Sequence, residues 1–181
     1  GVALFLEIYA EKIFPFSLQS NIIGILFRSF IIISFCEELV KWLFTYVICW
    51  KDKNFNYVYD AIVYCVFISL GFASIENLIA ILSNSGGFTL ALQRGLITVP
   101  AHAFFGIISG YYLGLAKKYE ARRWNKRKRK YIILSLLIPI IVHGMFDSLL
   151  FLSSTASLLF ATALIVYLYL SSALKVVKTS S

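Results

Sequence analysis

Glu37, Glu38 and Lys41 place three ionisable side chains within five residues of one another. On the surface of a soluble protein this cluster would be ordinary. Here it lies inside a mostly apolar run at residues 20–50, which is long enough to cross a bilayer of roughly 30 Å. Ionisable groups at that depth cost at least about 2.5 kcal/mol each on insertion scales, so they usually have a function. The chemistry that such carboxyls suit best is general base catalysis, with a glutamate acting on water.

The spacing of these three residues predicts different roles for the two glutamates. Lys41 follows Glu37 by four residues and Glu38 by three, so on a helix it can neighbour either carboxylate. Adjacent helical residues point about 100° apart, so one carboxylate is expected to face a reaction site while the other binds Lys41 or a second helix. A purely structural ion pair is the competing interpretation, although one lysine does not neutralise two buried acids.

The only histidines of the chain, His102 and His143, also lie in apolar runs, and each follows a proline (Pro100 and Pro139). A proline frees a backbone carbonyl and kinks a helix, which suits a water-containing cavity. His102 is followed by a stripe of small residues at every fourth position, for which close helix packing is the simplest interpretation. The stripe consists of Gly106, Gly110 and Gly114.

Three further polar residues accompany the histidines. Asp147 lies four residues after His143, so it can fix the imidazole tautomer or help to hold a substrate oxygen. Glu76 and Asn77 form a polar pair in another apolar run, and Arg94 is a plausible partner for Glu76 or Asp147. A scaffolding salt bridge is the leading interpretation for Glu76.

The charges of this set do not balance. Four carboxyls face the cationic side chains of Lys41 and Arg94, which leaves two negative charges to be offset by neutral carboxyls, protonated histidine or a bound cation. No cofactor is expected if a glutamate activates water, but a divalent metal such as zinc is the alternative, since histidine and carboxylate are zinc ligands. Its predicted ligands are Glu37, His102 and His143.

Other nucleophiles fit poorly. Cys36 lies beside the glutamate pair but has no positioned base, and Ser109 lies two helical turns from His102. The sequence has no HExxH motif. A water activated by glutamate therefore remains the best candidate.

The composition predicts the element that must position these residues, a membrane-embedded helical bundle. The chain of 181 residues is 60% hydrophobic and 14% charged, against about 45–50% and about 25% in soluble domains. We expect an all-α, polytopic, multi-pass membrane protein with a single domain over residues 1–181. The start at Gly1, without a signal-peptide n-region, is what a trimmed N-terminus predicts. At least five spans are predicted, at residues 20–50, 57–83, 88–116, 131–152 and 155–174, with a polar loop at 51–56 and a turn at 84–87.

The positive charges predict orientation. The basic loop 117–130 holds nine lysines and arginines, and loop 51–56 and tail 175–181 hold two each, which together are 13 of the 17 in the chain. Positive residues favour the cytoplasmic side, so this loop and the C-terminus are predicted to be cytoplasmic, with anionic lipid at the loop. A basic block between apolar runs argues against nucleic-acid binding. The same topology places both glutamates of the pair and both histidines near the middle of their spans, at one depth.

Four motifs follow one another on separate apolar segments: EExxK (Glu37, Glu38, Lys41), FAxxEN (Phe72, Ala73, Glu76, Asn77), HxxxG (His102, Gly106) and HxxxD (His143, Asp147). Over residues 34–147 they resemble the PrsW family of bacterial intramembrane proteases, which is related to the CAAX prenyl protease and bacteriocin-processing superfamily. The resemblance implies a glutamate-dependent protease that cuts membrane-anchored proteins, in the founding case an anti-sigma factor.

The resemblance also implies roles for individual residues. Glu37 looks like the general base, since the first glutamate of the pair serves in the related CAAX proteases, and Glu38 looks like a supporting residue. His102 is implied to help hold the water, and His143 with Asp147 to form the oxyanion side. The related enzymes often carry asparagine at the position of Asp147. Metal-dependent hydrolysis by the same residues, a proton-coupled transporter and a non-catalytic membrane adaptor are the alternatives.

Overall fold

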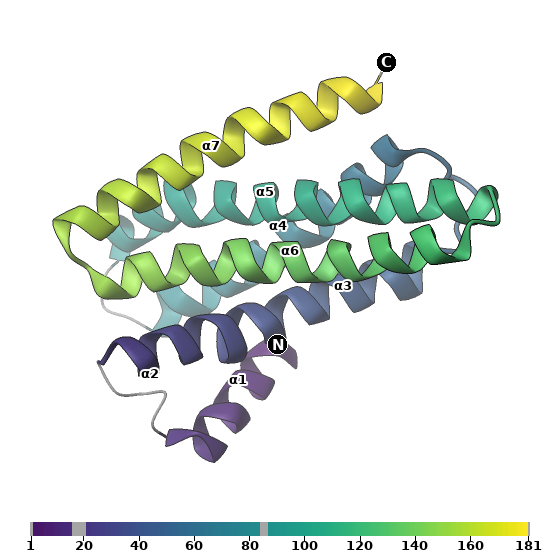
Figure 1. The fold of residues 1–181 in the computed structure, drawn as a ribbon. Helices are drawn as coiled ribbons and strands as arrows, with labels where there is room; N and C mark the ends of the chain where they lie inside the picture. The colour runs from purple at the N-terminus through teal and green to yellow at the C-terminus, as the bar shows by residue number, and fades with distance from the viewer. Residues whose placement is uncertain (1, 16–20, 84–86, 181) are drawn as a thin grey trace.

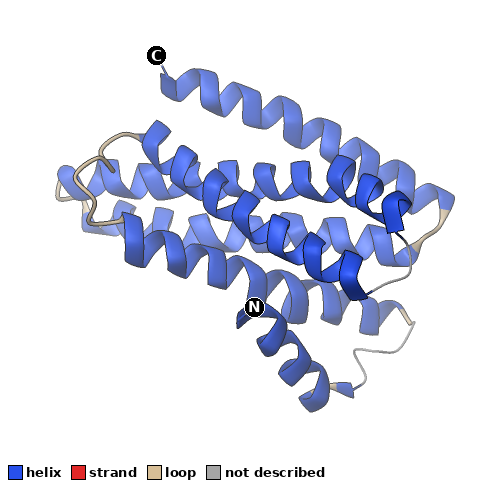
Figure 2. Ribbon diagram, turned by 180° about the vertical axis from the view of Figure 1, so that it is seen from behind, coloured by secondary structure: helices blue, strands red, loops and turns tan. Residues whose placement is uncertain are grey.

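The computed structural model describes residues 2–15, 21–83 and 87–180, and within them the chain is helical and contains no strand (Figure 1). Figure 2 shows the same bundle from behind, with long helices running side by side. Four helices, α4 to α7, are long and apolar enough to cross a membrane, which confirms the predicted polytopic helical bundle. The elements are α1 (Val2–Ile13), α2 (Ile22–Phe27), the π-helical segment η2 (Arg28–Ser34), α3 (Phe35–Cys49), α4 (Val58–Ser83), α5 (Gly87–Ala121), α6 (Asn125–Leu152) and α7 (Thr155–Ser180).

The predicted span at residues 20–50 folds as one continuous helical run from residue 22 to residue 49, made of α2, η2 and α3. Asn21 caps its start, because its side-chain oxygen accepts a hydrogen bond from the backbone N–H of Gly24 at 2.7 Å. The π-helical segment η2 was not predicted. It precedes the glutamate pair directly, and short π-helical insertions in α-helices occur frequently at functional sites.

The connections differ from the prediction in one place. The polar loop at 51–56 is non-helical, as expected. Most of the predicted turn at 84–87 lies outside the described residues, and Gly87, with a φ of +52°, begins α5. The predicted basic loop 117–130 is wrong as a loop, because α5 continues to residue 121 and α6 begins at residue 125. Lysine and arginine are good helix formers, so these charges extend two helices beyond the apolar core.

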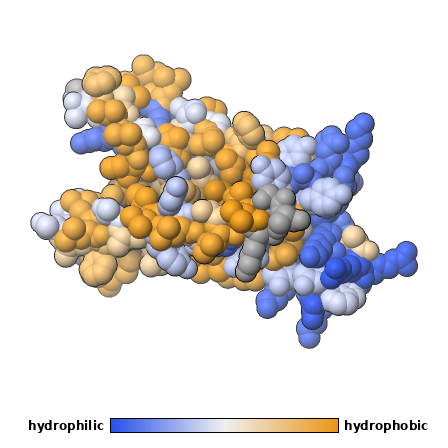
Figure 3. All heavy atoms as spheres, turned by 90° about the horizontal axis from the view of Figure 1, so that it is seen from above, coloured by the Kyte–Doolittle hydropathy of each residue, from blue (hydrophilic) through white to orange (hydrophobic). Residues whose placement is uncertain are grey.

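The hydrophilic atoms gather at one end of the molecule, while its middle is mostly hydrophobic (Figure 3). This is the end at which α5 and α6 connect (Figure 1). The surface pattern fits a body embedded in lipid with a charged cap on one side.

The glycine stripe of α5 brings this helix into backbone contact with α4. A Cβ atom added to Gly110 would lie 2.5 Å from the Cα of Ile62, and one added to Gly114 would lie 2.6 Å from the Cα of Val58. No side chain fits at these positions, as the packing interpretation predicted. The close contact fixes α5, and with it His102, against α4.

We expect Gly110→Ala to destabilise the bundle, because the new methyl group would force the backbones of α4 and α5 apart, at a cost of about 1–3 kcal/mol. Thermal unfolding in detergent measures the effect. Gly95→Ala is the matched control on the same helix, since nothing lies within 4 Å of a Cβ atom at Gly95. Equal unfolding temperatures for the two variants would contradict the tight contact.

Candidate active site

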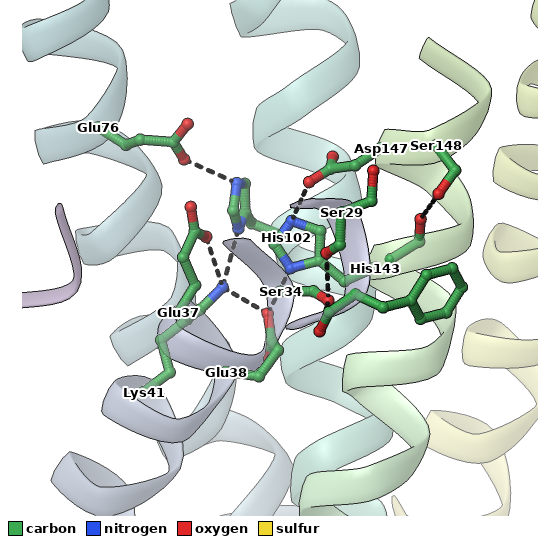
Figure 4. Close-up of polar contacts among 12 residues, drawn as sticks. Ser29, Ser34, Glu37, Glu38, Lys41, Glu76, His102, His143, Asp147 and Ser148 are labelled. Carbon is green, nitrogen blue, oxygen red and sulfur yellow. Dashed lines mark hydrogen bonds and ion pairs between the residues drawn. The ribbon is translucent and has the colours of Figure 1, made fainter. Parts of the chain in front are cut away.

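The helix α3 carries Glu37, Glu38 and Lys41 into the centre of the bundle, where no more than 6% of each side chain is exposed. The Lys41 ammonium donates a hydrogen bond to Glu38 Oε1 at 2.5 Å and lies 3.5 Å from Glu37 Oε2 (Figure 4). The same ammonium lies 4.7 Å from the centre of the Phe72 ring. Lys41 is therefore bound most closely to the second glutamate of the pair.

The two adjacent carboxylates face different surroundings, as their spacing predicted. Glu38 Oε1 accepts from Lys41 and also lies 2.9 Å from His143 Nδ1. Glu37 instead lines a cavity, and within the described part of the chain its carboxylate accepts a hydrogen bond only from Lys41, at the long distance of 3.5 Å. Of the pair, Glu37 is the carboxylate that a molecule in the cavity would meet.

His102 comes from α5 and lies between Lys41 and Glu76. Its Nδ1 is 3.1 Å from Lys41 Nζ, and its Nε2 is 3.1 Å from Glu76 Oε2 (Figure 4). Because an ammonium only donates, Nδ1 accepts and the proton of a neutral ring belongs on Nε2, towards Glu76. The Nε2 contact is at ion-pair distance without hydrogen-bond geometry, so the buried Glu76 Oε2 accepts no hydrogen bond from the residues that the structure describes.

His143 comes from α6 and lies between two carboxylates. Its Nδ1 faces Glu38 Oε1 at 2.9 Å, and its Nε2 lies 3.3 Å from Asp147 Oδ2, one helical turn further along the same helix. The ring stacks on Phe105, with the ring centres 4.7 Å apart. The centres of the two histidine rings are 5.3 Å apart, so residues from three helices converge at one level of the bundle.

Arg94 pairs with Glu76 rather than with Asp147. Its Nη2 donates to Glu76 Oε1 at 2.6 Å, and its Nε donates to Asn77 Oδ1 at 2.7 Å. The salt bridge expected for Glu76 is present, but the same carboxylate also faces His102. Glu76 therefore links the scaffold to the centre of the site.

A cavity of about 650 Å³ begins at these residues and extends between the helices. At this end of the cavity the lining is polar. It consists of Glu37, Glu76, His102, His143 and Asp147. The rest of the lining is mostly apolar and comes from six helical segments, α1, η2 and α3 to α6. It includes Ala3, Ile33, Val40, Phe44, Phe72, Ile75, Ile79, Ala101, Phe105, Phe146, Leu150 and Phe151. The cavity gives the Glu37 carboxylate access to a ligand in an otherwise apolar environment.

Sequence reasoning missed three features of the site. Glu7 on α1 also lines the cavity, and α1 is tied to the π-helical segment by an ion pair between Arg28 and Glu11, at 3.0 Å. Gly144 lies against Phe30, where a Cβ atom would come within 2.5 Å of the ring. In the sequence these features are indicated only by the charged residues of α1 and by the glycine next to His143. Neither indicates which residue it contacts.

The three residues predicted as metal ligands lie together. Glu37, His102 and His143 each offer one ligand atom, and these atoms lie within 4.8 Å of one another. Two imidazoles and one carboxylate form a known zinc-binding set. Each ring also has a carboxylate partner that would orient it, Glu76 for His102 and Glu38 or Asp147 for His143, as ligating histidines usually do. The donor set fits a divalent metal, provided that the Lys41 ammonium leaves Glu37 and His102.

The geometry therefore combines a cavity-facing carboxylate with two imidazoles held by other carboxylates. A carboxylate in this position is able to take a proton from a small molecule in the cavity. A nearby imidazole N–H is able to donate to an oxygen on which negative charge develops. Together they provide the groups needed for hydrolysis.

The comparisons of this chain with protein families and with curated proteins agree on one family. The family model described as PrsW family intramembrane metalloprotease matches residues 1–174. The protein named Protease PrsW of Halalkalibacterium halodurans is 42% identical over 129 residues, which are 71% of this chain and 57% of that protein. Protease PrsW of Clostridioides difficile is 38% identical over 128 residues, 70% of this chain and 52% of that protein.

Protease PrsW of Bacillus subtilis is 37% identical over 127 residues, which are 70% of this chain and 56% of that protein. The chain thus spans about half the length of the curated relatives that it matches. No solved structure matches the chain significantly.

Proposed function

This chain belongs to the PrsW family of intramembrane metalloproteases, and from that membership and the geometry of the site we propose that it hydrolyses a peptide bond of a membrane-anchored protein. The observation that carries the proposal is that the two glutamates of the pair have different surroundings. Glu37 faces the cavity, whereas Glu38 is bound by Lys41 and His143. The relatives' name supports protease activity, and the substrate class follows the resemblance to proteases that act on anti-sigma factors.

In the proposed reaction Glu37 takes a proton from water, and the resulting hydroxide adds to the carbonyl carbon of the peptide bond. The negative charge on the carbonyl oxygen is stabilised by His143, which donates from Nε2, with Asp147 beside it. The proton held by Glu37 then passes to the amide nitrogen, and the C–N bond breaks to give a carboxylate and an amine. His102 helps to hold the water, and Glu38, Lys41, Glu76, Asn77 and Arg94 keep the reacting groups in place.

The family's description as metalloproteases and the proximity of three ligand atoms favour a second version of this hydrolysis, with a divalent metal held by Glu37, His102 and His143. When bound, such a metal would supply Lewis-acid polarisation of an oxygen and a lower pKa for bound water. Metal analysis of the purified protein, with and without chelation, separates the versions. A stoichiometric ion that is required for cleavage would overturn the metal-free version.

Glu76→Gln is expected to lower kcat by about 10- to 100-fold with little change in KM, because the carboxylate that faces His102 Nε2 would become an amide of similar shape. Cleavage kinetics of a membrane-anchored reporter measure the effect. Asn77→Ala is the comparison for the scaffold role alone, and we expect a smaller loss, since Asn77 binds Arg94 at 2.7 Å and reaches His102 only through Arg94 and Glu76. An equal decrease of kcat in the two variants would show that Glu76 acts only as part of the scaffold.

We further propose that the basic segment at the α5–α6 connection faces the cytoplasm and anionic lipid. Lys117 and Lys128 bind Glu120, and the Arg127 guanidinium lies 4.6 Å from the ring of the half-exposed Trp124. Aromatic and cationic side chains together suit the interface between lipid head groups and water. Labelling of the Lys126→Cys variant at its new thiol from the cytoplasmic side alone supports this orientation; labelling only from the opposite side contradicts it.

A further inference from the structure

The Lys41 ammonium lies among the atoms that would bind a metal. We propose that this ammonium competes with a divalent cation for Glu37 and His102, and that it withdraws onto Glu38 when a cation binds. The inference rests on the metal-dependent version of the proposed function. In this role the positively charged Lys41 side chain lowers the affinity of the site for a metal ion.

The distances place Lys41 in direct competition. Its Nζ lies 3.1 Å from His102 Nδ1 and 3.5 Å from Glu37 Oε2, and these residues supply two of the three ligand atoms. A metal such as zinc lies about 2.0–2.2 Å from nitrogen and oxygen ligands. A cation that used the lysine-facing atoms of Glu37 and His102 would therefore lie close to the ammonium. Because both carry positive charge in a buried site, they repel each other strongly.

Lys41 already has another binding position. It donates to Glu38 Oε1 at 2.5 Å, its shortest contact, and it lies over the face of the Phe72 ring at 4.7 Å. Releasing Glu37 and His102 would cost Lys41 its two longer contacts and leave the closest one. Glu38 is thus the counter-ion that allows the lysine to move aside without losing its charge partner.

The net charge of the cluster agrees with two binding positions for the Lys41 ammonium, one with a bound cation and one without. The four carboxyls around the histidines exceed the cationic side chains of Lys41 and Arg94 by two negative charges. A divalent cation would balance that excess while Lys41 remains on Glu38. Without a cation, the ammonium shared between both glutamates and His102 keeps the pair partly neutralised, which stabilises the arrangement seen here.

The test is Co²⁺ binding to detergent-solubilised protein, followed by the visible absorption of the cobalt ion, with Zn²⁺ as competitor. Lys41→Met removes the ammonium and keeps an unbranched side chain that is shorter by that one group. We expect this variant to bind Co²⁺ at least about tenfold more tightly than the wild type, because the like-charge repulsion is gone. Lys51→Met, in the exposed loop after α3, is the matched control and is expected to leave the affinity unchanged.

Three further variants guard against misfolding and indirect effects. Lys41→Gln also removes the charge, so it is expected to raise the affinity if the methionine variant does not fold. Glu38→Gln should act in the opposite direction and lower the affinity, because the ammonium then loses its alternative partner. Glu37→Gln in the Lys41→Met background should abolish the cobalt absorption, since a ligand is lost.

An affinity in Lys41→Met and Lys41→Gln within about threefold of the wild type would overturn the inference. So would the absence of metal binding in every variant. Because binding is measured without substrate, the outcome is separate from protease activity. A protein that binds cobalt as described but cleaves no substrate would refute the proposed function and leave the competition intact.

Discussion

Glu37→Gln is expected to slow peptide-bond cleavage by about 10²- to 10⁴-fold while leaving the fold intact, because the variant loses the only cavity-facing carboxylate of the pair and keeps its shape. The rate is measured with a tagged, membrane-anchored reporter in proteoliposomes, and the fold by thermal unfolding in detergent. Glu37 contributes little to packing, since its hydrogen bond to Lys41 is long, at 3.5 Å.

Glu38→Gln is the matched comparison, one residue away and equally buried. Removing its charge leaves Lys41 and His143 without their shared counter-ion, so we expect a loss of stability of about 3 kcal/mol as well as a loss of activity. A Glu37→Gln variant that cleaves at the wild-type rate, beside an inactive but stable Glu38→Gln, would reverse the assignment of the base.

The second large effect is expected at His143. In His143→Asn the amide nitrogen keeps the donor towards Glu38 in place of Nδ1, but the Nε2 donor beside Asp147 is lost. Loss of a donor to the developing oxyanion typically lowers kcat by about 10²- to 10³-fold, and KM is expected to change little. Single-turnover cleavage of the same reporter measures this change.

Asp147→Asn and His143→Gln separate the oxyanion role from general disruption. Asp147→Asn keeps a polar side chain beside Nε2, so we expect its activity to stay within about tenfold of the wild type. His143→Gln restores a donor near the Nε2 position and should recover part of the activity lost in His143→Asn. Equal inactivity of all three variants would argue that His143 acts only as a packing residue.

The common level of the site residues in the bundle was predictable because charge and hydropathy together indicate where each span begins and ends. The alternating basic segments predict a consistent topology, and this topology puts Glu37, His102 and His143 at one level. The four-residue spacing of His143 and Asp147 and the packing of the glycine stripe were predictable for a similar reason, since both are properties of a single helix.

The pairing across helices was not predictable, because it depends on the order of the helices around the bundle. Nothing in the sequence shows that His102 would face Lys41 while His143 faces Glu38. The π-helical segment before the glutamate pair also leaves no signal in a run of apolar residues. The charge pattern predicts a loop where α5 and α6 in fact continue as helices, because lysine and arginine favour helix.

The central claim, that this chain cleaves a membrane-anchored protein with Glu37 as the essential base, is tested most directly by new protein N-termini. Membranes that contain equal amounts of the wild type or of Glu37→Gln are compared by N-terminal labelling and mass spectrometry. We predict N-termini within or next to a membrane anchor that occur only with the wild type. The same N-termini with both proteins would contradict the role of Glu37, and none with either, at verified expression, would contradict the protease itself.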